Sequence, residues 1–217
     1  MTHTTVTAAE MKALEKAAND NGLLYIQMME NAGRAAYAEL KRRVPALRRL
    51  LIVAGKGNNG GDGFVMARVA AKEGVQVRVL LAEGEPKTAD AKTNLARLAE
   101  TAAEVVRDTE QAAFGADAVV DALYGTGFHG ELRPGGAAAC ALMGRERERG
   151  AFVLALDLPS GVSADSGEVA EGAVQADATV TFDCTKPLHF AKASKPFCGA
   201  LVCADIGIGK ALGERET

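Results

Sequence analysis

The chain of 217 residues contains no tryptophan, and aromatic residues make up only 5% of it. Many RNA-binding domains stack bases on aromatic side chains, so this composition gives little support to such a domain. The formal net charge is −3, so the chain has no excess of Lys and Arg of the kind that is typical of a nucleic-acid-binding surface. We therefore expect no nucleic acid among the partners of this protein.

Long apolar runs are also missing, because no stretch approaches the roughly 18 residues of a membrane span. The amino terminus shows no apolar core of a signal peptide. The cysteines form no Cys-x-x-Cys pair and have no histidine at zinc-site spacing. We expect reduced thiols, a cytoplasmic location and no membrane partner. The four cysteines are Cys140, Cys184, Cys198 and Cys203.

Apolar stretches of strand length alternate with segments of helical spacing along the chain. This alternation predicts an α/β fold with helices on both faces of a mostly parallel sheet. A capping box of Thr7 and Glu10 marks the start of a first helix. No linker or repeat interrupts the pattern, so we expect one domain over residues 1–217. Core strands are expected near 49–54, 75–81, 117–121, 151–156 and 177–182, a short element at 105–106, an edge strand at 200–204, and further helices near 26–43, 62–73, 88–100 and 135–148.

The most informative segment is the run Gly-Lys-Gly-Asn-Asn-Gly-Gly-Asp-Gly at residues 55–63, which we expect to be a loop between a buried strand and a helix. A strand, a glycine-rich turn and a helix together bind nucleotides through backbone amides. The five glycines permit a ligand to approach the backbone closely and allow positive φ. Nucleotide binding is the first interpretation.

The same segment fits the dinucleotide pattern G-x-G-x-x-G, and Glu83 lies about where a ribose-binding acid would fall. Asp62, however, places a negative charge where a pyrophosphate would bind, which is unfavourable unless a cation or another donor intervenes. An ordinary NAD-dependent oxidoreductase is therefore an alternative that Asp62 argues against.

Three further polar segments follow later strands, at residues 121–131, 157–161 and 183–187. The carboxyl ends of parallel strands share one edge of the sheet, so these segments should converge on one crevice. Residues 125–127, Gly-Thr-Gly, offer amides for a second phosphate or form a plain turn. His129 could act as an acid or base, or be an ordinary loop histidine.

Oxygen donors in these segments favour a hard cation. Asn59, Asp121 and Ser160 supply amide, carboxylate and hydroxyl oxygens without a thiolate or an imidazole. This donor set suits an alkali or alkaline-earth ion better than zinc or copper. Such a cation would also offset the charge of Asp62.

At these residues the chain resembles the NAD(P)H-hydrate epimerase family, the YjeF N-terminal domain. The resemblance covers nearly the whole sequence, and its motifs occur in order along the chain. These motifs are residues 29–33, 57–63, 121–127, 157–161, 185–187 and 205–208.

The resemblance implies a Rossmann-like three-layer α/β/α sandwich that is usually dimeric. It implies an isomerase that interconverts the R and S epimers of hydrated NADH or NADPH, whose nicotinamide carries a hydroxyl at C6. An ADP- or ATP-dependent dehydratase then repairs the S form. In this family a potassium ion would be held by Asn59, Asp121 and Ser160. The substrate would be bound by Asn58, Asn59, Gly60, Gly61, Asp62, Gly125, Thr126, Gly127, Phe128, His129, Gly130, Glu131 and Asp157.

Epimerisation requires the C6–oxygen bond to break and to form again on the other face of the ring. Asp157 is our candidate for the principal catalytic acid or base, with Lys186 as its partner. A non-catalytic nucleotide- or RNA-binding scaffold of the same fold is the alternative. The chain could be a free-standing epimerase or half of a bifunctional protein. As the interface of a homodimer, we expect the first two helices with Met11, Leu14, Met28 and Met29.

Overall fold

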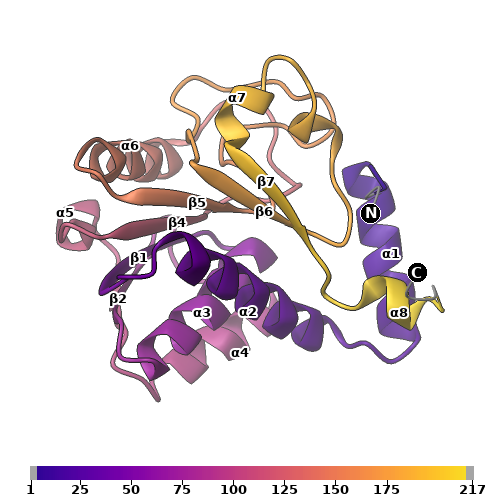
Figure 1. Ribbon diagram of the computed structural model, residues 1–217, viewed down its shortest axis with the longest axis horizontal. Coiled ribbons are helices and arrows are strands. Elements are labelled where there is room, and N and C mark those ends of the chain that lie inside the picture. Colours follow the sequence, from indigo (N-terminus) through magenta and orange to yellow (C-terminus); the bar gives the residue numbers. More distant parts are fainter. Residues whose placement is uncertain (1–3, 214–217) are drawn as a thin grey trace.

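A parallel sheet of seven strands forms the centre of the protein (Figure 1). The computed structural model describes residues 4–213. The strands are β1 (Arg49–Ala54), β2 (Gln76–Leu81), β3 (Glu104–Val106), β4 (Ala118–Ala122), β5 (Phe152–Leu156), β6 (Ala178–Phe182) and β7 (Ala200–Ala204). Their order is β3-β2-β1-β4-β5-β6-β7, and every neighbouring pair is parallel. The predicted α/β class is confirmed.

Helices cover both faces of this sheet (Figure 1). They are α1 (Ala8–Asp20), α2 (Tyr25–Arg43), α3 (Asn58–Lys72), α4 (Ala89–Leu98), α5 (Thr109–Ala112), α6 (Pro134–Glu148), α7 (Lys195–Cys198), α8 (Ile208–Ala211) and the 3-10 helix η1 (Pro187–His189). α2, α3 and α4 lie on one side of the sheet, and α5 and α6 lie on the other. The three layers match the expected sandwich.

The residues of β1 show why both faces need a cover. Leu50 and Ile52 pack into the core that contains α2 and α3. Leu51 and Val53 point the opposite way, into the core beneath α6. Successive side chains of a strand alternate between faces, so a fully apolar strand is stable only when helices cover both faces.

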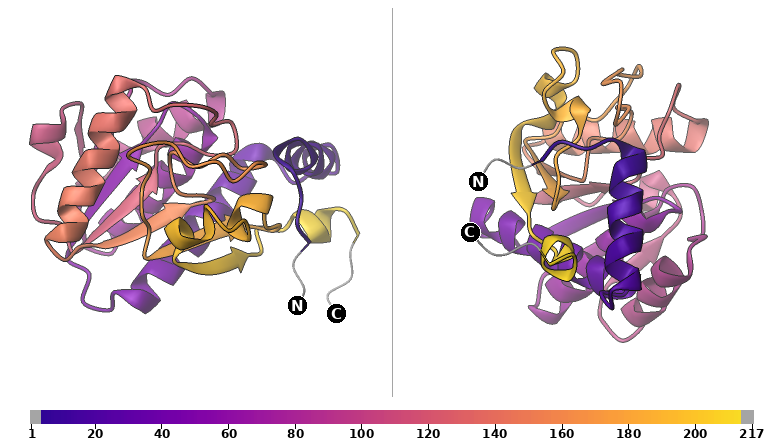
Figure 2. Two further views of the ribbon diagram at one scale, coloured as in Figure 1. Left: turned by 90° about the horizontal axis from the view of Figure 1, so that it is seen from above. Right: turned by 90° about the vertical axis from the view of Figure 1, so that its right-hand side faces the viewer.

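The strand order reverses between β1 and β4, which places a crevice at their carboxyl ends. α1 lies outside the two helical layers, beyond this end of the sheet, and packs against α8 (Figure 2). Its predicted capping box is confirmed, because the Thr7 hydroxyl accepts a hydrogen bond from Glu10 N and the Glu10 carboxylate accepts one from Thr7 N. Within the described residues, no helix has both the length and the apolar character of a membrane span.

The glycine-rich segment differs from our expectation, because α3 begins at Asn58 instead of near residue 62. Within residues 55–63, no glycine has positive φ. The glycines instead permit close packing: a Cβ on Gly55 would lie 1.8 Å from Leu123 O, and one on Gly60 would lie 2.2 Å from Gly55 O. At Gly57 a Cβ would meet nothing within 4 Å. Most of these glycines therefore serve the fold, and Gly57 leaves space for a ligand.

The expected dimer surface is wrong for three of its four residues, because only Leu14 among them is partly exposed. Met11, Met28 and Met29 are each about 5% exposed or less and pack inside the molecule. The apolar residues that α2 does expose at its start are Leu24, which is 56% exposed, and Tyr25, which is 36% exposed. Amphipathic spacing identified an apolar face, but that face packs within the chain.

The charged end of α6 is also only partly solvated. Glu146 is fully buried and accepts hydrogen bonds from Ala116 N at 3.0 Å and Arg149 Nη1 at 2.9 Å. This carboxylate therefore joins α6 to the segment that precedes β4.

α2 and α3 pack closely at Gly33. A Cβ on Gly33 would lie 2.6 Å from Val65 Cβ and 2.7 Å from Asp62 O. Gly33→Ala should therefore lower the free energy of unfolding by roughly 1–3 kcal/mol through overpacking. Chemical denaturation measures this change.

Gly144→Ala is the matched control, because Gly144 lies in α6 and a Cβ added there would meet nothing within 4 Å. Alanine should stabilise that helix by about 0.5–1 kcal/mol. Equal effects of the two substitutions would contradict the packing argument.

Candidate active site

A pocket of about 160 Å³ opens at the carboxyl ends of the strands, between the sheet and α1. Its wall combines α1, the starts of α2 and α3, and the segments after β4, β5 and β6. It is lined by Met11, Glu15, Tyr25, Met28, Met29, Ala32, Asn58, Asn59, Asp62, Gly125, Thr126, Asp157, Phe182, Lys186 and Ile206. Segments that lie far apart in the sequence thus meet at the predicted crevice.

Asp157 and Lys186 form an ion pair in this pocket. Lys186 Nζ donates to Asp157 Oδ1 at 2.5 Å and to Thr181 Oγ1 at 2.8 Å. The lysine side chain is 1% exposed and the aspartate side chain 14% exposed. Burial alone would raise the pKa of Asp157, but the charge and hydrogen bond of Lys186, with Thr181, hold that pKa below its usual value. Asp157 is therefore an ionised carboxylate in neutral solution.

Asp157 occupies a backbone conformation that few residues other than glycine adopt, with φ of 64°. It directly follows β5, and its amide donates to Val180 O on the neighbouring strand. Asp and Asn tolerate this left-handed region better than most side chains. The turn aims the carboxylate back over the end of the sheet, toward Lys186.

His189 braces both members of the pair, and the sequence analysis overlooked it. Lys186 N donates to His189 Nδ1 at 2.9 Å, and His189 Nε2 lies 3.0 Å from Asp157 O. Burial lowers the pKa of His189 to about 4, so the ring is neutral at pH 7. One neutral tautomer, with the proton on Nε2, makes both bonds. His189 is thus a positioning residue, whereas the candidate His129 is exposed and does not line the pocket.

A second polar cluster joins Asp121, Ser160 and Asn59 around the backbone of Tyr124. Ser160 donates to both carboxylate oxygens of Asp121, from Oγ at 2.6 Å and from N at 2.7 Å. Tyr124 N donates to Ser160 Oγ at 2.9 Å, and Asn59 Nδ2 donates to Tyr124 O at 2.8 Å. The three residues expected to share a cation therefore belong to one connected cluster.

The orphaned oxygen of Asn59 makes this cluster suitable for a cation. Asn59 Oδ1 is buried and has no hydrogen-bond partner within the described residues. A buried carbonyl oxygen without a partner is costly unless something else coordinates it. Burial also raises the pKa of Asp121 to about 6, although three hydrogen bonds to its carboxylate act to lower that pKa. A monovalent cation would both use the amide oxygen and favour the Asp121 carboxylate.

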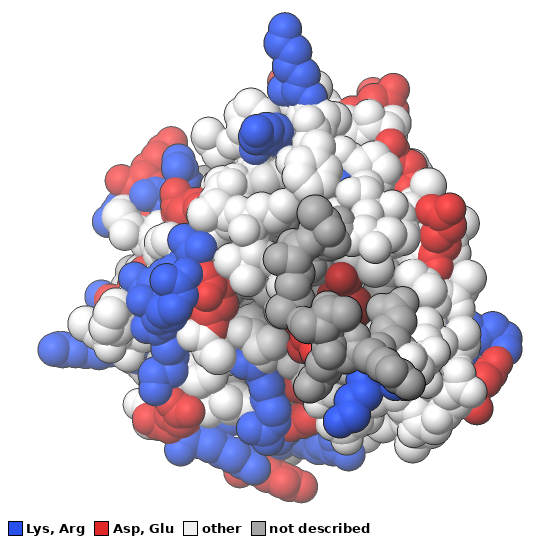
Figure 3. Space-filling model, turned by 45° about the vertical axis from the view of Figure 1, so that its right-hand side comes forward, with Lys and Arg blue, Asp and Glu red and all other residues white. Residues whose placement is uncertain are grey.

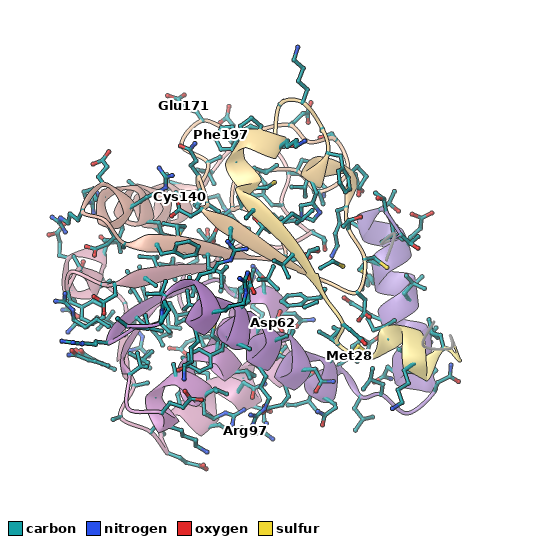
Figure 4. The ribbon with its side chains drawn as sticks, viewed as in Figure 1. Met28, Asp62, Arg97, Cys140, Glu171 and Phe197 are labelled. Atoms are coloured by element: carbon teal, nitrogen blue, oxygen red, sulfur yellow. The ribbon has the colours of Figure 1, made fainter. Side chains whose placement is uncertain are left out.

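Two more carboxyl groups line the pocket, Glu15 from α1 and Asp62 from the second turn of α3. Figure 4 labels Asp62. Burial raises the pKa of Asp62 well above its usual value, and the charges of Asp157 and Glu15 add to this. Burial and Asp157 also raise the pKa of Glu15, which Lys186 and Lys12 partly offset. Sequence patterns singled out Asp62 but not Glu15.

The predicted substrate residues divide into two groups. The pocket wall includes Asn58, Asn59, Asp62, Gly125, Thr126 and Asp157. It does not include Gly60, Gly61, Gly127, Phe128, His129, Gly130 or Glu131. Phe128 is buried and stacks on Tyr124 at 5.1 Å between ring centroids, so its side chain supports the loop. The roles of both groups in binding stay predictions.

Glu83, the acid expected for an ordinary NAD-dependent oxidoreductase, already has partners. Tyr124 Oη donates to Glu83 Oε1 at 2.8 Å, and Arg133 Nε lies 3.5 Å from the same oxygen. Its side chain is 9% exposed. A carboxylate held in this way is poorly suited to bind a ribose, which weakens that alternative.

Comparison with known proteins agrees with this architecture. Residues 25–188 match the family described as YjeF-related protein N-terminus. A crystal structure of the yeast protein ynu0 superposes with a TM-score of 0.76, covering 93% of this chain and 88% of the yeast chain at 19% identity. At this identity the likeness shows the fold alone.

Curated relatives are more similar in sequence. The NAD(P)H-hydrate epimerase of Pirellula staleyi is 40% identical, over 89% of this chain and 87% of the relative. The enzyme of the same name from Limosilactobacillus fermentum is 31% identical, over 94% of this chain and 98% of the relative. The bifunctional NAD(P)H-hydrate repair enzyme Nnr of Coxiella burnetii is 35% identical over 94% of this chain, which spans only 41% of that relative.

The family match takes in well over half of the chain, and it contains most of the pocket residues. Two relatives align along most of their own length. The chain therefore belongs to the YjeF-related protein N-terminus family.

Proposed function

We propose that this protein is an NAD(P)H-hydrate epimerase, an isomerase that interconverts the R and S epimers of hydrated NADH or NADPH. The two relatives of similar length carry this name. The structural observation that carries the proposal is the Asp157–Lys186 ion pair, in a pocket that also contains the start of α3.

The start of α3 is suited to the phosphates of a dinucleotide. The N-cap residue is Gly57, whose lack of a side chain leaves the first backbone amides of the helix uncapped. Such amides, together with the positive end of the helix dipole, favour anions. Gly125 and Thr126 face them across the pocket, from the segment after β4. We assign the pyrophosphate to this side and the nicotinamide ring to the side of Asp157.

Epimerisation at C6 exchanges a hydroxyl group between the two faces of the ring. Cleavage requires a proton for the leaving oxygen and produces a cation that the ring nitrogen stabilises. Return of water requires a base to accept a proton. Asp157 suits the base, since it is ionised at neutral pH and lies at the pocket wall. Lys186 holds that carboxylate in place and maintains its charge.

We also propose a potassium ion at Asn59, Asp121 and Ser160. The orphaned Asn59 Oδ1 and the hard oxygens of the other two residues support this assignment. When bound, the ion supplies positive charge that offsets the buried Asp121 and the phosphates of the substrate. Asn59 and Ser160 then couple the cation cluster to the backbone of Tyr124, which leads into Gly125.

The S epimer would pass to an ADP- or ATP-dependent dehydratase, in agreement with the name of the bifunctional relative. We further propose a cytoplasmic homodimer that binds no nucleic acid. A purely scaffolding role has less support, because the pocket keeps an ion pair that costs desolvation energy and that a scaffold would not need.

Asp157→Asn should lower kcat for epimerisation by about 10²–10⁴-fold, because asparagine cannot accept a proton. The assay supplies the R-hydrate with a dehydratase specific for the S form and measures recovery of NAD(P)H. Since the substitution also leaves Lys186 buried without a counter-charge, it should cost about 3–5 kcal/mol of stability. The double variant Asp157→Asn/Lys186→Met should regain stability but not activity.

Asp183→Asn is the matched control. Asp183 also has positive φ, 53°, directly after the next strand, but its carboxylate accepts from Ile206 N and Ile208 N and does not line the pocket. Its activity should stay near that of the wild type. Full activity in the stable double variant would remove Asp157 from the mechanism.

Exchange of potassium for tetramethylammonium at constant ionic strength should lower Tm and activity together. At a potassium concentration about ten times Kd, binding contributes ~1.4 kcal/mol, or roughly 3–6 °C in Tm for a chain of this size. Asn59→Ala should abolish the response of Tm to potassium. Asn58→Ala should retain it, because Asn58 is exposed and, among the described residues, forms no hydrogen bond with Asp121 or Ser160. An identical Tm in both salts would contradict the site.

A further inference from the structure

The pocket contains more negative than positive charge. Glu15, Asp62 and Asp157 all line it, and Lys186 is its one basic side chain among the residues described. In the space-filling view turned toward this end, Lys and Arg gather at the lower left, whereas some acidic atoms are visible near the centre of the face (Figure 3). Lys186 is paired with Asp157, so the other two carboxyl groups have no cation of their own inside the pocket.

Asp62 differs from Asp157 in having no donor. Within the described residues, no hydrogen bond or ion pair reaches the Asp62 carboxyl, although α3 positions it at the pocket wall. The charged groups that act on it are Asp157 after β5 and Glu15 on α1, and both are negative. A carboxyl group in such surroundings is more stable with its proton than without it.

We propose that Asp62 is the catalytic acid of the epimerisation and that Glu15 is a positioning residue whose negative charge adds to burial and to Asp157 in favouring the neutral Asp62 carboxyl. This inference rests on the proposed function and adds to it the identity of the proton donor. The two aspartates follow a general rule: two titratable groups whose surroundings push their pKa values apart take opposite roles as acid and base.

The proton balance of this reaction is complete. In one direction Asp62 gives its proton to the C6 hydroxyl, the C6–oxygen bond breaks with both electrons going to oxygen, and water leaves. Water then attacks C6 on the other face and gives a proton to Asp157. The enzyme now holds ionised Asp62 and protonated Asp157, which is the state required for the reverse direction. Exchange of protons with solvent restores the first state.

The other titratable groups of the pocket are less suited to give this proton. Lys186 Nζ is engaged with Asp157 and Thr181. Asp157 holds its proton weakly, since Lys186 lowers its pKa. His189 is neutral and uses both ring nitrogens to brace Lys186 and Asp157. Glu15 also lines the pocket, but the charges of Lys186 and Lys12 partly offset the rise in its pKa, whereas no group among the described residues offsets the rise in the pKa of Asp62. Asp62 is therefore the group best suited to give the proton.

Asp62→Asn tests the catalytic role. It should lower kcat about 10²–10⁴-fold and change KM less than threefold, because the amide keeps the shape of the side chain but cannot donate an acidic proton. It should also unfold at the same or a higher temperature at pH 7. Ionisation of a carboxyl group with a raised folded-state pKa destabilises the fold, so its stabilising contribution is present at low pH and is lost as pH rises through that pKa.

Glu15→Gln tests the positioning role through the pH profile. Without the Glu15 charge, Asp62 should lose its proton at lower pH, and the alkaline limb of kcat for the R-to-S direction should shift to lower pH. Asp20→Asn is the matched control on the same helix, because Asp20 is exposed and pairs with Lys16 away from the pocket. It should leave the profile unchanged.

The outcomes separate this inference from the proposed function. An active wild type with full kcat in Asp62→Asn would overturn the inference and leave the epimerase assignment intact. Loss of fold in Asp62→Asn, or a clear fall in its Tm, would show that the carboxyl is structural and would also overturn it. An unshifted profile in Glu15→Gln would remove Glu15 from the proposal. A folded, potassium-loaded wild type that does not accelerate epimerisation would refute the function itself.

Discussion

The ion pair between Asp157 and Lys186 constrains how the chain folds around the pocket at the carboxyl ends of the strands. Both charges lie almost out of water, and a buried charge without its partner would cost several kcal/mol. The pair can form only if β5 ends in a left-handed turn and the chain after β6 returns beside it. His189 fixes this geometry by bonding the backbone of both partners. The local strain at Asp157 is thus balanced by contacts that also define the pocket.

The excess of negative charge in the pocket is the second constraint, and it changes the protonation state that we infer for Asp62. An ionised Asp62 in a pocket that also holds a pyrophosphate conflicts with simple electrostatics, which argued against an ordinary dinucleotide loop. A protonated Asp62 removes the conflict, because a neutral carboxyl group neither repels the phosphates nor needs a counter-ion. The proposed potassium ion then offsets Asp121 instead of Asp62. Two of the acids at this end therefore lose their unfavourable charge in different ways: a cation offsets the charge of Asp121, and a proton neutralises Asp62.

Sequence patterns predicted the layers and strands well. A strand that is buried on both faces appears in the sequence as an apolar run, such as residues 50–54, and these runs alternate with segments of helical spacing. The patterns also predicted that Asp121, Asp157 and Ser160 lie at one edge of the sheet, since the carboxyl ends of parallel strands share that edge. The start of α3 was missed because glycines suggest a loop, whereas here they permit helix packing. Glu15 and His189 were missed because their roles depend on contacts with residues that are distant in sequence or lie on another element. Local sequence patterns do not predict such contacts.

The placement of Glu15 follows from contacts between the segment before α1 and the segment after β6. Val6 N donates to Thr185 O at 2.9 Å, and Thr185 N donates to Thr4 O at 3.1 Å, so the segment before α1 pairs with the residue before Lys186. Ala8 N also donates to Asp165 Oδ1 at 2.8 Å, which anchors the first turn of the helix. The carboxylate of Glu15 and the ammonium of Lys186 are therefore positioned by the same backbone contacts. Any shift of the lysine segment would move α1 with it, so the balance of charge around Asp62 is coupled to the ion pair that fixes Asp157.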